Sequence, residues 1–304
     1  SAIMRIIKGC PRTCSYCVVP NLEGRKITEY QKEAIINHFQ EYYSMGYTNY
    51  IFWDSNLLFG KENLYVLLNY LIDYGYNESI TLDFSYGLEF ALINDQFIEI
   101  LSKFKLKNAL YVPIESSEYD LYKTRFHRPN SHLGVITETV EKLKAANYKN
   151  MSFYIMTGLP NQTLEQIIKT MIFGWRLGLS PKIMMYTPIP GTEEFPKYLD
   201  FYKDKEHWEL NPYLFPCESE ELTKETLLYL HKLDHYTLAY TEEEGFFLQK
   251  YVVDPIVNST KEVKFKLLKL HFEEQNPILK RFHDLLIEED IRQEEINNKL
   301  TTVY

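Results

Sequence analysis

Short apolar stretches alternate with longer amphipathic stretches along the first two-thirds of the chain. The apolar stretches have the length of strands, and the others repeat apolar residues at helical spacing. Before the last of these helices, Thr163 and Gln166 form the pattern of a capping box. The predicted strands cover residues 3–7, 49–52, 80–84, 108–114, 150–156 and 182–186. The predicted helices cover residues 28–45, 61–74, 94–104, 131–146 and 163–177.

Strands that alternate with helices predict a parallel sheet with helical crossovers. Eight such units close a full barrel, so six predict an incomplete, open one. We therefore predict an α/β fold, a partial (β/α)6 TIM-like barrel, over residues 1–198. From residue 199 strand signals fade, and charged segments at 223–240, 261–272 and 277–298 predict a mainly helical C-terminal region. A domain upstream of residue 1 stays an open alternative.

Composition narrows the class of protein. The chain has 304 residues and a net charge of −9, and a broad nucleic-acid footprint usually needs a basic face instead. We therefore expect a small-molecule or peptide substrate more than nucleic acid. No apolar run reaches the ~20 residues of a membrane span, and four cysteines are too few for a disulfide scaffold. These features predict a cytoplasmic protein.

Three of the four cysteines fall within the segment KGCPRTCSYC, at positions 10, 14 and 17. A structural zinc site needs four ligands, and no second Cys or His pair follows at a suitable spacing. A [4Fe–4S] cluster normally takes four thiolates, so three leave one iron without a protein ligand. An open coordination position marks a catalytic centre more than a structural one. The role of the remaining cysteine, Cys217, is open, and a lone Cys is usually a small buried hydrophobe.

The spacing C-x3-C-x2-C resembles the cluster loop of the radical S-adenosylmethionine (SAM) superfamily. The resemblance implies that Cys10, Cys14 and Cys17 ligate a [4Fe–4S] cluster whose open iron chelates SAM. In that family the reduced cluster cleaves SAM, and the resulting 5′-deoxyadenosyl radical abstracts a hydrogen atom from the substrate. It also implies an external electron donor, such as a flavodoxin or ferredoxin. Tyr16, just before the third cysteine, would lie against the adenine of SAM.

Three later segments resemble parts of the same family, and a fourth departs from its usual pattern, over about residues 3–195. SFYIMTGLPNQT resembles the fifth-strand segment that flanks adenine, although Asn161 and Gln162 stand where Gly-Glu is usual. YTPIPGTEEF resembles the sixth-strand segment, and VPIESSEYD the fourth-strand segment that approaches SAM. The usual Gly-Gly-Glu that binds the amino group of SAM is replaced by WDSN after the second strand. The resemblance thus implies the SAM contacts Asp54, Asn56, Glu115, Ser116, Ile155 and Gly158.

The resemblance leaves the reaction open among methylation, rearrangement and oxidation, and it assigns no catalytic residue. CSYCVVPNLEGR is similar to the methylthiotransferases, RNA-modifying enzymes that carry three more cysteines upstream. GCPRTC, DSN, GLP and PIPGT are similar to the cobalamin-binding branch, which we favour, so cobalamin is an open further cofactor. A non-catalytic iron–sulfur protein for electron transfer is the alternative from another class. Two weaker groups of candidates for substrate contact are Arg125, His127 and Arg128, and Asp83, Gly87 and Glu89.

Overall fold

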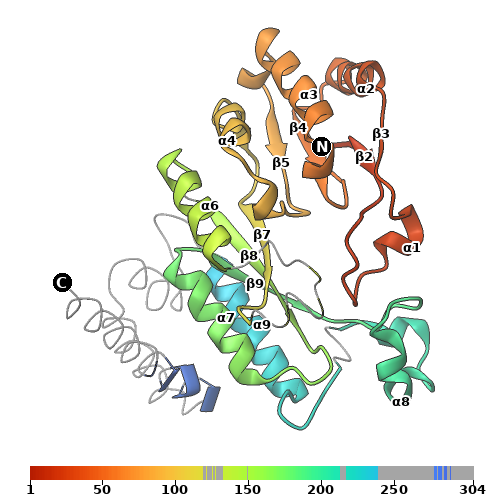
Figure 1. Cartoon of the computed structure of the whole chain (residues 1–304), viewed down its shortest axis with the longest axis vertical. Coiled ribbons are helices and arrows are strands. Elements are labelled where there is room, and N and C mark those ends of the chain that lie inside the picture. The colour runs from red at the N-terminus through yellow and green to blue at the C-terminus, as the bar shows by residue number, and fades with distance from the viewer. Residues whose placement is uncertain are drawn as a thin grey trace, which may run out of the picture. The chain divides into compact units, whose positions relative to one another are not determined.

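The computed structural model describes residues 1–118, 121, 125, 127, 133–148, 150–212 and 217–238, and single residues between 277 and 288. The chain divides into two compact units (Figure 1). Unit 1 comprises Ser1–Tyr154 and Thr187–Asn211, and unit 2 comprises Ile155–Tyr186 and Pro212–Tyr304. No helix among the described residues is long and apolar enough to cross a membrane.

Unit 1 is built on a parallel sheet with the strand order β1-β4-β5-β6. Its strands are β1 (Ala2–Met4), β4 (Asn49–Phe52), β5 (Thr81–Asp83) and β6 (Lys105–Leu106). Helices α2 (Lys32–Ser44), α3 (Lys61–Asp73) and α4 (Asp95–Leu101) lie between successive strands in the sequence. The β1–β4, β4–β5 and β5–β6 pairs are all parallel. The predicted α/β class with helical crossovers is therefore confirmed.

Aromatic side chains fill the layer between this sheet and its helices. Phe39 of α2 packs on Tyr50 of β4 with ring centroids 4.8 Å apart. Phe52 stacks on Phe84 at 5.1 Å, and Phe84 meets Phe97 of α4 at 6.3 Å. Residues two apart in a strand share a face, so Tyr50 and Phe52 both point toward the helices. This alternation explains why residues 49–52 form a strand at the predicted position.

The predicted strand 3–7 and the start of the predicted helix 28–45 are wrong in detail. The first strand ends at Met4, and a second pair forms from β2 (Ile7–Lys8) and β3 (Thr28–Glu29), which run antiparallel. Helix α2 consequently begins four residues later than predicted. The physical cause is long-range, because the backbone N–H groups of Ile6 and Ile7 donate to the Asp54 carboxylate instead of continuing a strand.

The remaining strands belong to a three-stranded sheet with the order β7-β8-β9. These are β7 (Leu110–Glu115), β8 (Met151–Thr157) and β9 (Ser180–Met185), close to three predicted strands. Helix α6 (Leu133–Ala145) belongs to unit 1 and precedes β8 in the sequence. The short elements of unit 1 are α1 (Val19–Glu23), η1 (Leu57–Gly60), η2 (Tyr76–Glu78), η3 (Phe90–Leu92), η4 (Phe195–Tyr198), α8 (Leu199–Tyr202) and η5 (His207–Leu210).

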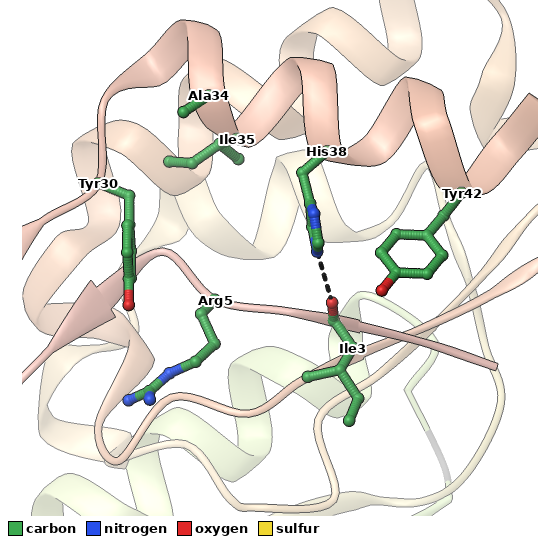
Figure 2. A pocket seen from close by; sticks show the side chains of 7 residues that line it. All are labelled: Ile3, Arg5, Tyr30, Ala34, Ile35, His38 and Tyr42. Carbon is green, nitrogen blue, oxygen red and sulfur yellow. Dashed lines mark hydrogen bonds between the residues drawn. The ribbon is translucent and has the colours of Figure 1, made fainter.

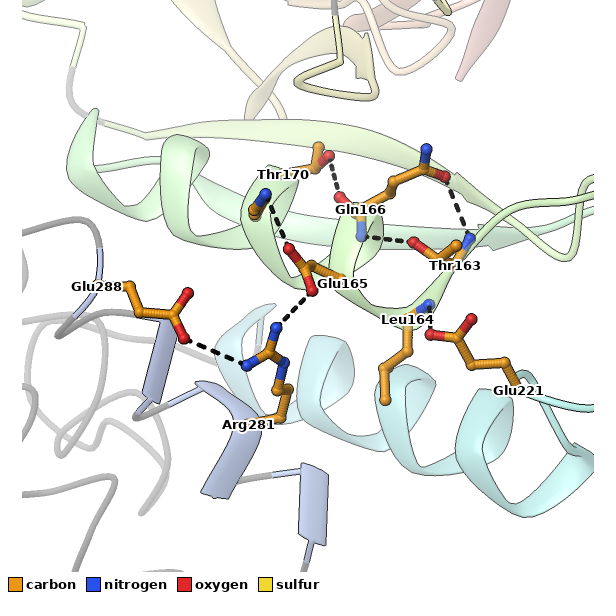
Figure 3. Close-up of polar contacts among 9 residues, drawn as sticks. Thr163, Leu164, Glu165, Gln166, Thr170, Glu221, Arg281 and Glu288 are labelled. Atoms are coloured by element: carbon orange, nitrogen blue, oxygen red, sulfur yellow. Dashed lines mark hydrogen bonds and ion pairs between the residues drawn. The ribbon is translucent and has the colours of Figure 1, made fainter. Parts of the chain in front are cut away.

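In unit 2, helices α7 (Leu164–Arg176) and α9 (Lys224–Leu238) pack against β9. Figure 3 shows the predicted capping box at the start of α7, where Thr163 and Gln166 exchange side-chain and backbone bonds of 3.1 and 3.2 Å. Arg281 pairs with Glu165 of α7 and contacts Glu288 at 3.5 Å. The described residues between 277 and 288 are helical, as predicted, whereas the predicted helix 261–272 lies outside the described residues.

Candidate functional site

The cysteine segment forms a loop directly after β2. Cys10 and Cys14 are buried, and Cys17 is half-buried. The loop is folded by backbone bonds, from Cys10 N to Gly24 O at 3.1 Å and from Cys17 N to Cys14 O at 3.0 Å. Gly9 enters the loop with φ +95°, and a Cβ there would lie 2.3 Å from the carbonyl oxygen of Lys26. A glycine is therefore required at the start of the loop.

A buried glutamate from a distant segment holds the middle of the loop. Glu194, which is fully buried, accepts a hydrogen bond of 2.7 Å from the hydroxyl of Ser15, between the second and third cysteines. Its backbone N–H donates to Ser15 O at 3.2 Å. The carboxylate also pairs with Arg125 Nε at 3.3 Å and with Lys197 Nζ at 3.0 Å. Two cations thus compensate the buried charge, as a buried carboxylate requires.

Tyr16 and Glu115, both predicted to contact SAM, meet in the structure. The Tyr16 hydroxyl donates to Glu115 Oε1 at 2.6 Å. Glu115 ends β7 with φ 64°, a left-handed conformation that is uncommon outside glycine. Ser116 follows it, is buried, and accepts a hydrogen bond from Glu118 N at 3.1 Å. Backbone strain of this kind clusters at functional sites, and it supports a functional interpretation of Glu115.

Asp54 and Asn56, the two residues that replace Gly-Gly-Glu, are both buried. Asp54 Oδ1 accepts from Ile6 N at 2.8 Å and Ile7 N at 2.7 Å, which fixes the chain between β1 and β2. Its Oδ2, and the Oδ1 of Asn56, are buried and have no hydrogen-bond partner in the described part of the chain. Burial raises the pKa of Asp54 to about 6, although the two N–H groups and the charge of Arg5 oppose this.

A network of acidic residues ties these side chains to the loop. Asn56 Nδ2 donates to Glu89 Oε2 at 2.7 Å, and Glu89 forms an ion pair with Arg12. Arg12 lies between the first two cysteines of the loop. On the other side, Glu23 accepts two bonds from Arg5, at 2.8 and 2.9 Å, and bonds from Gly9 N and the Ser55 hydroxyl. Residues predicted from separate segments are thus brought together within unit 1.

Ile155 and Gly158, the other two predicted SAM contacts, lie in unit 2. Ile155 is buried in β8, and Gly158 follows this strand with φ +83°. The Gln162 side chain closes the next turn by donating to Met156 O at 2.7 Å. Asn161 takes φ 59°, a conformation that asparagine tolerates better than most residues, which explains why it can replace the usual glycine.

The weaker candidates for substrate contact lie in different parts of the structure. His127 Nδ1 lies 2.8 Å from the Thr13 hydroxyl of the cysteine loop, and Arg125 joins Glu194. Arg128 lies outside the described residues. Asp83 accepts from Asn108 Nδ2 at 2.7 Å, while Gly87 forms a turn with φ +86°. In unit 2, the buried Cys217 places its carbonyl oxygen 3.5 Å from where a Cβ of Gly158 would be.

A separate cavity of about 450 Å³ lies between β1 and α2 in unit 1. Figure 2 shows His38, whose Nε2 donates a hydrogen bond of 3.1 Å to the backbone carbonyl oxygen of Ile3 in this strand. None of the predicted cluster or SAM contacts lines this cavity. Its lining residues are Ile3, Arg5, Tyr30, Ala34, Ile35, His38 and Tyr42.

The donor set of the loop fits an iron–sulfur cluster better than a single ion. Among the residues that the structure describes, no group of three His, Cys, Asp or Glu side chains is arranged to hold one metal ion. Thiolates that each bind a different iron of a cluster do not need to converge on one point. The unpartnered oxygens of Asp54 and Asn56 supply hydrogen-bond acceptors that the N–H groups of an amino group would satisfy.

Comparison with known families places the chain. The model of the radical SAM superfamily matches residues 4–174. Sequence relatives include the tRNA-2-methylthio-N(6)-dimethylallyladenosine synthase of Thermotoga petrophila, 25% identical over 66% of this chain and 46% of that protein. The ribosomal protein uS12 methylthiotransferase RimO of Clostridium novyi is 30% identical over 54% of this chain and 38% of that protein. The chain therefore spans less than half the length of these curated relatives.

Solved structures confirm the predicted fold. The radical SAM methyltransferase TsrM from Kitasatospora setae, with cobalamin and a [4Fe–4S] cluster bound, matches with a TM-score of 0.60 and 11% identity, over 93% of this chain and 61% of that chain. The coproporphyrinogen III oxidase HemN from Escherichia coli, a radical SAM enzyme, matches with a TM-score of 0.50 and 11% identity, over 78% of this chain and 52% of that chain. The α/β fold is the partial barrel of these neighbours.

Sequence reasoning missed Glu194 and Glu23, and it treated Glu89 only as a candidate for substrate contact. All three are acidic residues outside the strands, which is a weak signal because most such residues are solvated. Their partners lie far away along the chain: Glu194 and Ser15 are 179 positions apart, and Glu89 and Arg12 are 77 apart. A clue was present for Glu194, which lies within the YTPIPGTEEF segment that resembles the family.

Proposed function

The chain belongs to the radical SAM superfamily, whose members are enzymes that use a [4Fe–4S] cluster and SAM, and on that premise we propose that it reductively cleaves SAM to modify a small substrate. When bound, the cluster supplies the electron that breaks a carbon–sulfur bond of SAM and yields the 5′-deoxyadenosyl radical. Cys10, Cys14 and Cys17 hold the cluster in this proposal. Residues 1–198 form the catalytic core, and residues 199–304 form the helical C-terminal region.

The single observation that carries the proposal is the construction of the cysteine loop. Three thiols lie on a loop that is fixed by hydrogen bonds to Glu194, Glu23 and Glu89. Three thiolates leave one iron of a four-iron cluster open for an exogenous ligand. Such a site suits the amino and carboxylate groups of SAM, and a closed electron-transfer site needs no open position.

The remaining predicted contacts receive separate roles in the proposal. Asp54 Oδ2 and Asn56 Oδ1 accept hydrogen bonds from the N–H groups of the SAM amino group, which would satisfy both buried oxygens. Glu115 orients the Tyr16 ring through its hydroxyl, so that the ring lies against adenine. Ser116 offers its hydroxyl to the same cofactor, and Ile155 and the turn at Gly158 flank the adenine from the fifth strand.

The context of the reaction follows from the same chemistry. Cleavage of SAM needs one electron from outside, so we propose a flavodoxin or ferredoxin as partner. Low-potential clusters and reduced thiols fit a reducing, cytoplasmic compartment. A methyl-group transfer through cobalamin supplied by another domain or protein is favoured by the likeness to TsrM, which is a cobalamin-containing methyltransferase.

A methylthiotransferase-like activity is the second candidate. It is favoured by the curated relatives, which are named as tRNA and ribosomal-protein methylthiotransferases. The acidic net charge of −9 weighs against a large RNA partner. Detection of a transferred CH3–S group on RNA or protein, rather than a CH3 group alone, would decide for this candidate.

Cleavage of SAM is the direct test of the proposed activity. The anaerobically reconstituted full chain, reduced with dithionite in the presence of SAM, is expected to form 5′-deoxyadenosine and methionine in equal amounts. Radical SAM enzymes often release some of both without their substrate, so the unknown substrate is not needed. Product formation is measured by liquid chromatography with mass detection. A reconstituted protein that contains its cluster but forms no 5′-deoxyadenosine would rule out the proposed activity.

Glu194 provides a prediction for the stability of the loop. Glu194→Ala removes the acceptor of the Ser15 hydroxyl and leaves the Arg125 charge without this partner. A hydrogen bond to a charged group contributes about 1.5–3 kcal/mol, so we expect the cluster to be lost roughly tenfold faster under a chelator. Loss is followed by the visible absorbance of the cluster. The exposed neighbour Glu193→Ala is the control, and equal rates in the two variants would contradict this role.

A further inference from the structure

Two exposed aromatic rings contact each other at a tilted angle beside the ends of neighbouring strands. Trp53 directly follows β4, and Tyr86 lies just beyond β5. Their ring centroids are 4.5 Å apart with planes inclined by 37°. Trp53 is 45% exposed and Tyr86 is 50% exposed. Paired large aromatic surfaces that stay open to solvent commonly mark a binding surface.

The pair faces away from the helices of unit 1. Phe52 and Phe84 point toward the helical layer, where Phe84 meets Phe97 of α4. Trp53 N still donates to Met4 O at 2.9 Å, so the strand geometry continues to this residue. Successive side chains of a strand point to opposite faces, which turns Trp53 to the side opposite Phe52. In a barrel of parallel strands that side is the interior.

The same pair is linked to the cysteine loop through short connections. Trp53 precedes the buried Asp54, and Asn56 follows two residues later. Tyr86 stands three positions before Glu89, which bonds both Asn56 and Arg12. A ring stacked on this pair would therefore lie beside the residues to which we assign the amino group of SAM.

A second aromatic pair makes the surface rigid. Tyr111 and Tyr154 stack at 5.0 Å with planes inclined by 11°, and the Tyr154 hydroxyl donates to Ser85 O, next to Tyr86. The pKa of Tyr154 is raised by its burial first, and then by neighbours that include Tyr86. Gly87 closes the turn with φ +86° and donates to Phe84 O at 2.9 Å. Preorganised rings lose little freedom when a ligand binds.

We propose that Trp53 and Tyr86 form a stacking platform that binds a planar aromatic ring of a small-molecule substrate. The inference rests on the proposed function, since it names the substrate class of that site. Stacking requires a flat π-system on the ligand, and it does not require the ligand to carry a charge. A small ligand fits better than a nucleic acid, because the carboxylates of Asp83 and Glu89 lie on the same connection and the chain carries a net charge of −9.

The test uses a flat probe and its saturated counterpart. The full chain with its reconstituted cluster and saturating SAM is titrated anaerobically by equilibrium dialysis with 2-naphthol and with decahydro-2-naphthol. We expect 2-naphthol to bind more tightly, and Trp53→Ala and Tyr86→Ala to weaken its binding about tenfold each. Trp53→Phe should restore most of the affinity. Tyr74→Ala is the matched control, because Tyr74 is also exposed and makes a similar tilted contact with the Tyr70 ring, with centroids 4.6 Å apart.

Three results would overturn the platform. The first is equal binding of the flat and saturated probes, and the second is an equal loss of 2-naphthol affinity in Tyr74→Ala. The third is that single-stranded oligoadenylate binds more tightly than 2-naphthol, in a salt-sensitive way, and that Trp53→Ala abolishes this binding. Cluster content and 5′-deoxyadenosine formation are measured on the same samples. Failure of ring binding with these two intact rejects the platform alone. Ring binding without SAM cleavage rejects the proposed function alone.

Discussion

A Cys14→Ser variant is expected to lose the cluster after anaerobic reconstitution. The wild-type chain should bind about four irons, and the variant should fall close to background, because two thiolates rarely retain a four-iron cluster. Serine has nearly the same volume as cysteine, so the buried position stays filled. Iron and acid-labile sulfide are measured per chain, together with the visible absorbance. SAM cleavage should disappear in the same variant.

The fourth cysteine gives the matched control for this experiment. Cys217 is also buried, but it lies in unit 2 and outside the C-x3-C-x2-C segment. Cys217→Ser should keep about four irons per chain. Retention of four irons in Cys14→Ser, or loss of the cluster in Cys217→Ser, would contradict the assignment of the three ligands. Circular dichroism of both variants separates loss of the cluster from loss of the fold.

The second large effect is expected at Asp54. Asp54→Ala removes the acceptor of the Ile6 and Ile7 N–H groups. An unsatisfied buried donor costs about 1–3 kcal/mol, so two of them should lower the free energy of unfolding by about 2–6 kcal/mol. Asp54→Asn keeps an oxygen for both N–H groups and should cost much less. The measurement is denaturant unfolding followed by circular dichroism; equal losses in the two variants would contradict the role of Oδ1.

The same carboxyl group predicts a pH dependence of stability. Burial raises the pKa of Asp54 in the folded state to about 6, above its ordinary value of 3.8. The folded state therefore favours the neutral acid, and this stabilisation is complete below pH 3.8 and is lost as the pH rises through 6. The loss amounts to about 3 kcal/mol at 1.4 kcal/mol per pH unit. Asp54→Asn should lack this pH dependence, so its free energy of unfolding should rise relative to that of the wild type between pH 4 and 7.

Local patterns were enough to predict most of the fold. Strand β4 appears at residues 49–52 as predicted, because Tyr50 and Phe52 alternate with less buried residues. Helices α3 and α7 agree with the prediction within two residues at each end. The failures occur where distant groups determine the backbone conformation. The Asp54 carboxylate, about 48 positions away, ends the first strand. Pairing with β2 makes residues 28–29 strand β3 instead of the start of the predicted helix.

The candidate site likewise contains residues that the local sequence could predict and residues that only distant contacts bring together. The spacing of Cys10, Cys14 and Cys17 is local and could be recognised directly. The hydrogen bond between Tyr16 and Glu115 crosses 99 positions, and only resemblance to a family suggested that both belong to one site. Nothing in the sequence indicated that Glu194 would hold Ser15, because a carboxylate that is solvated and one that is buried between two cations look alike in a sequence.

The central claim is that the three-cysteine loop leaves an iron open for SAM. Electron paramagnetic resonance of the reduced, reconstituted protein, recorded before and after addition of SAM, tests it most directly. We expect SAM to change the signal of the cluster, because its amino and carboxylate groups become ligands of that iron. An identical signal with and without SAM, in a sample that contains four irons per chain, would contradict the claim.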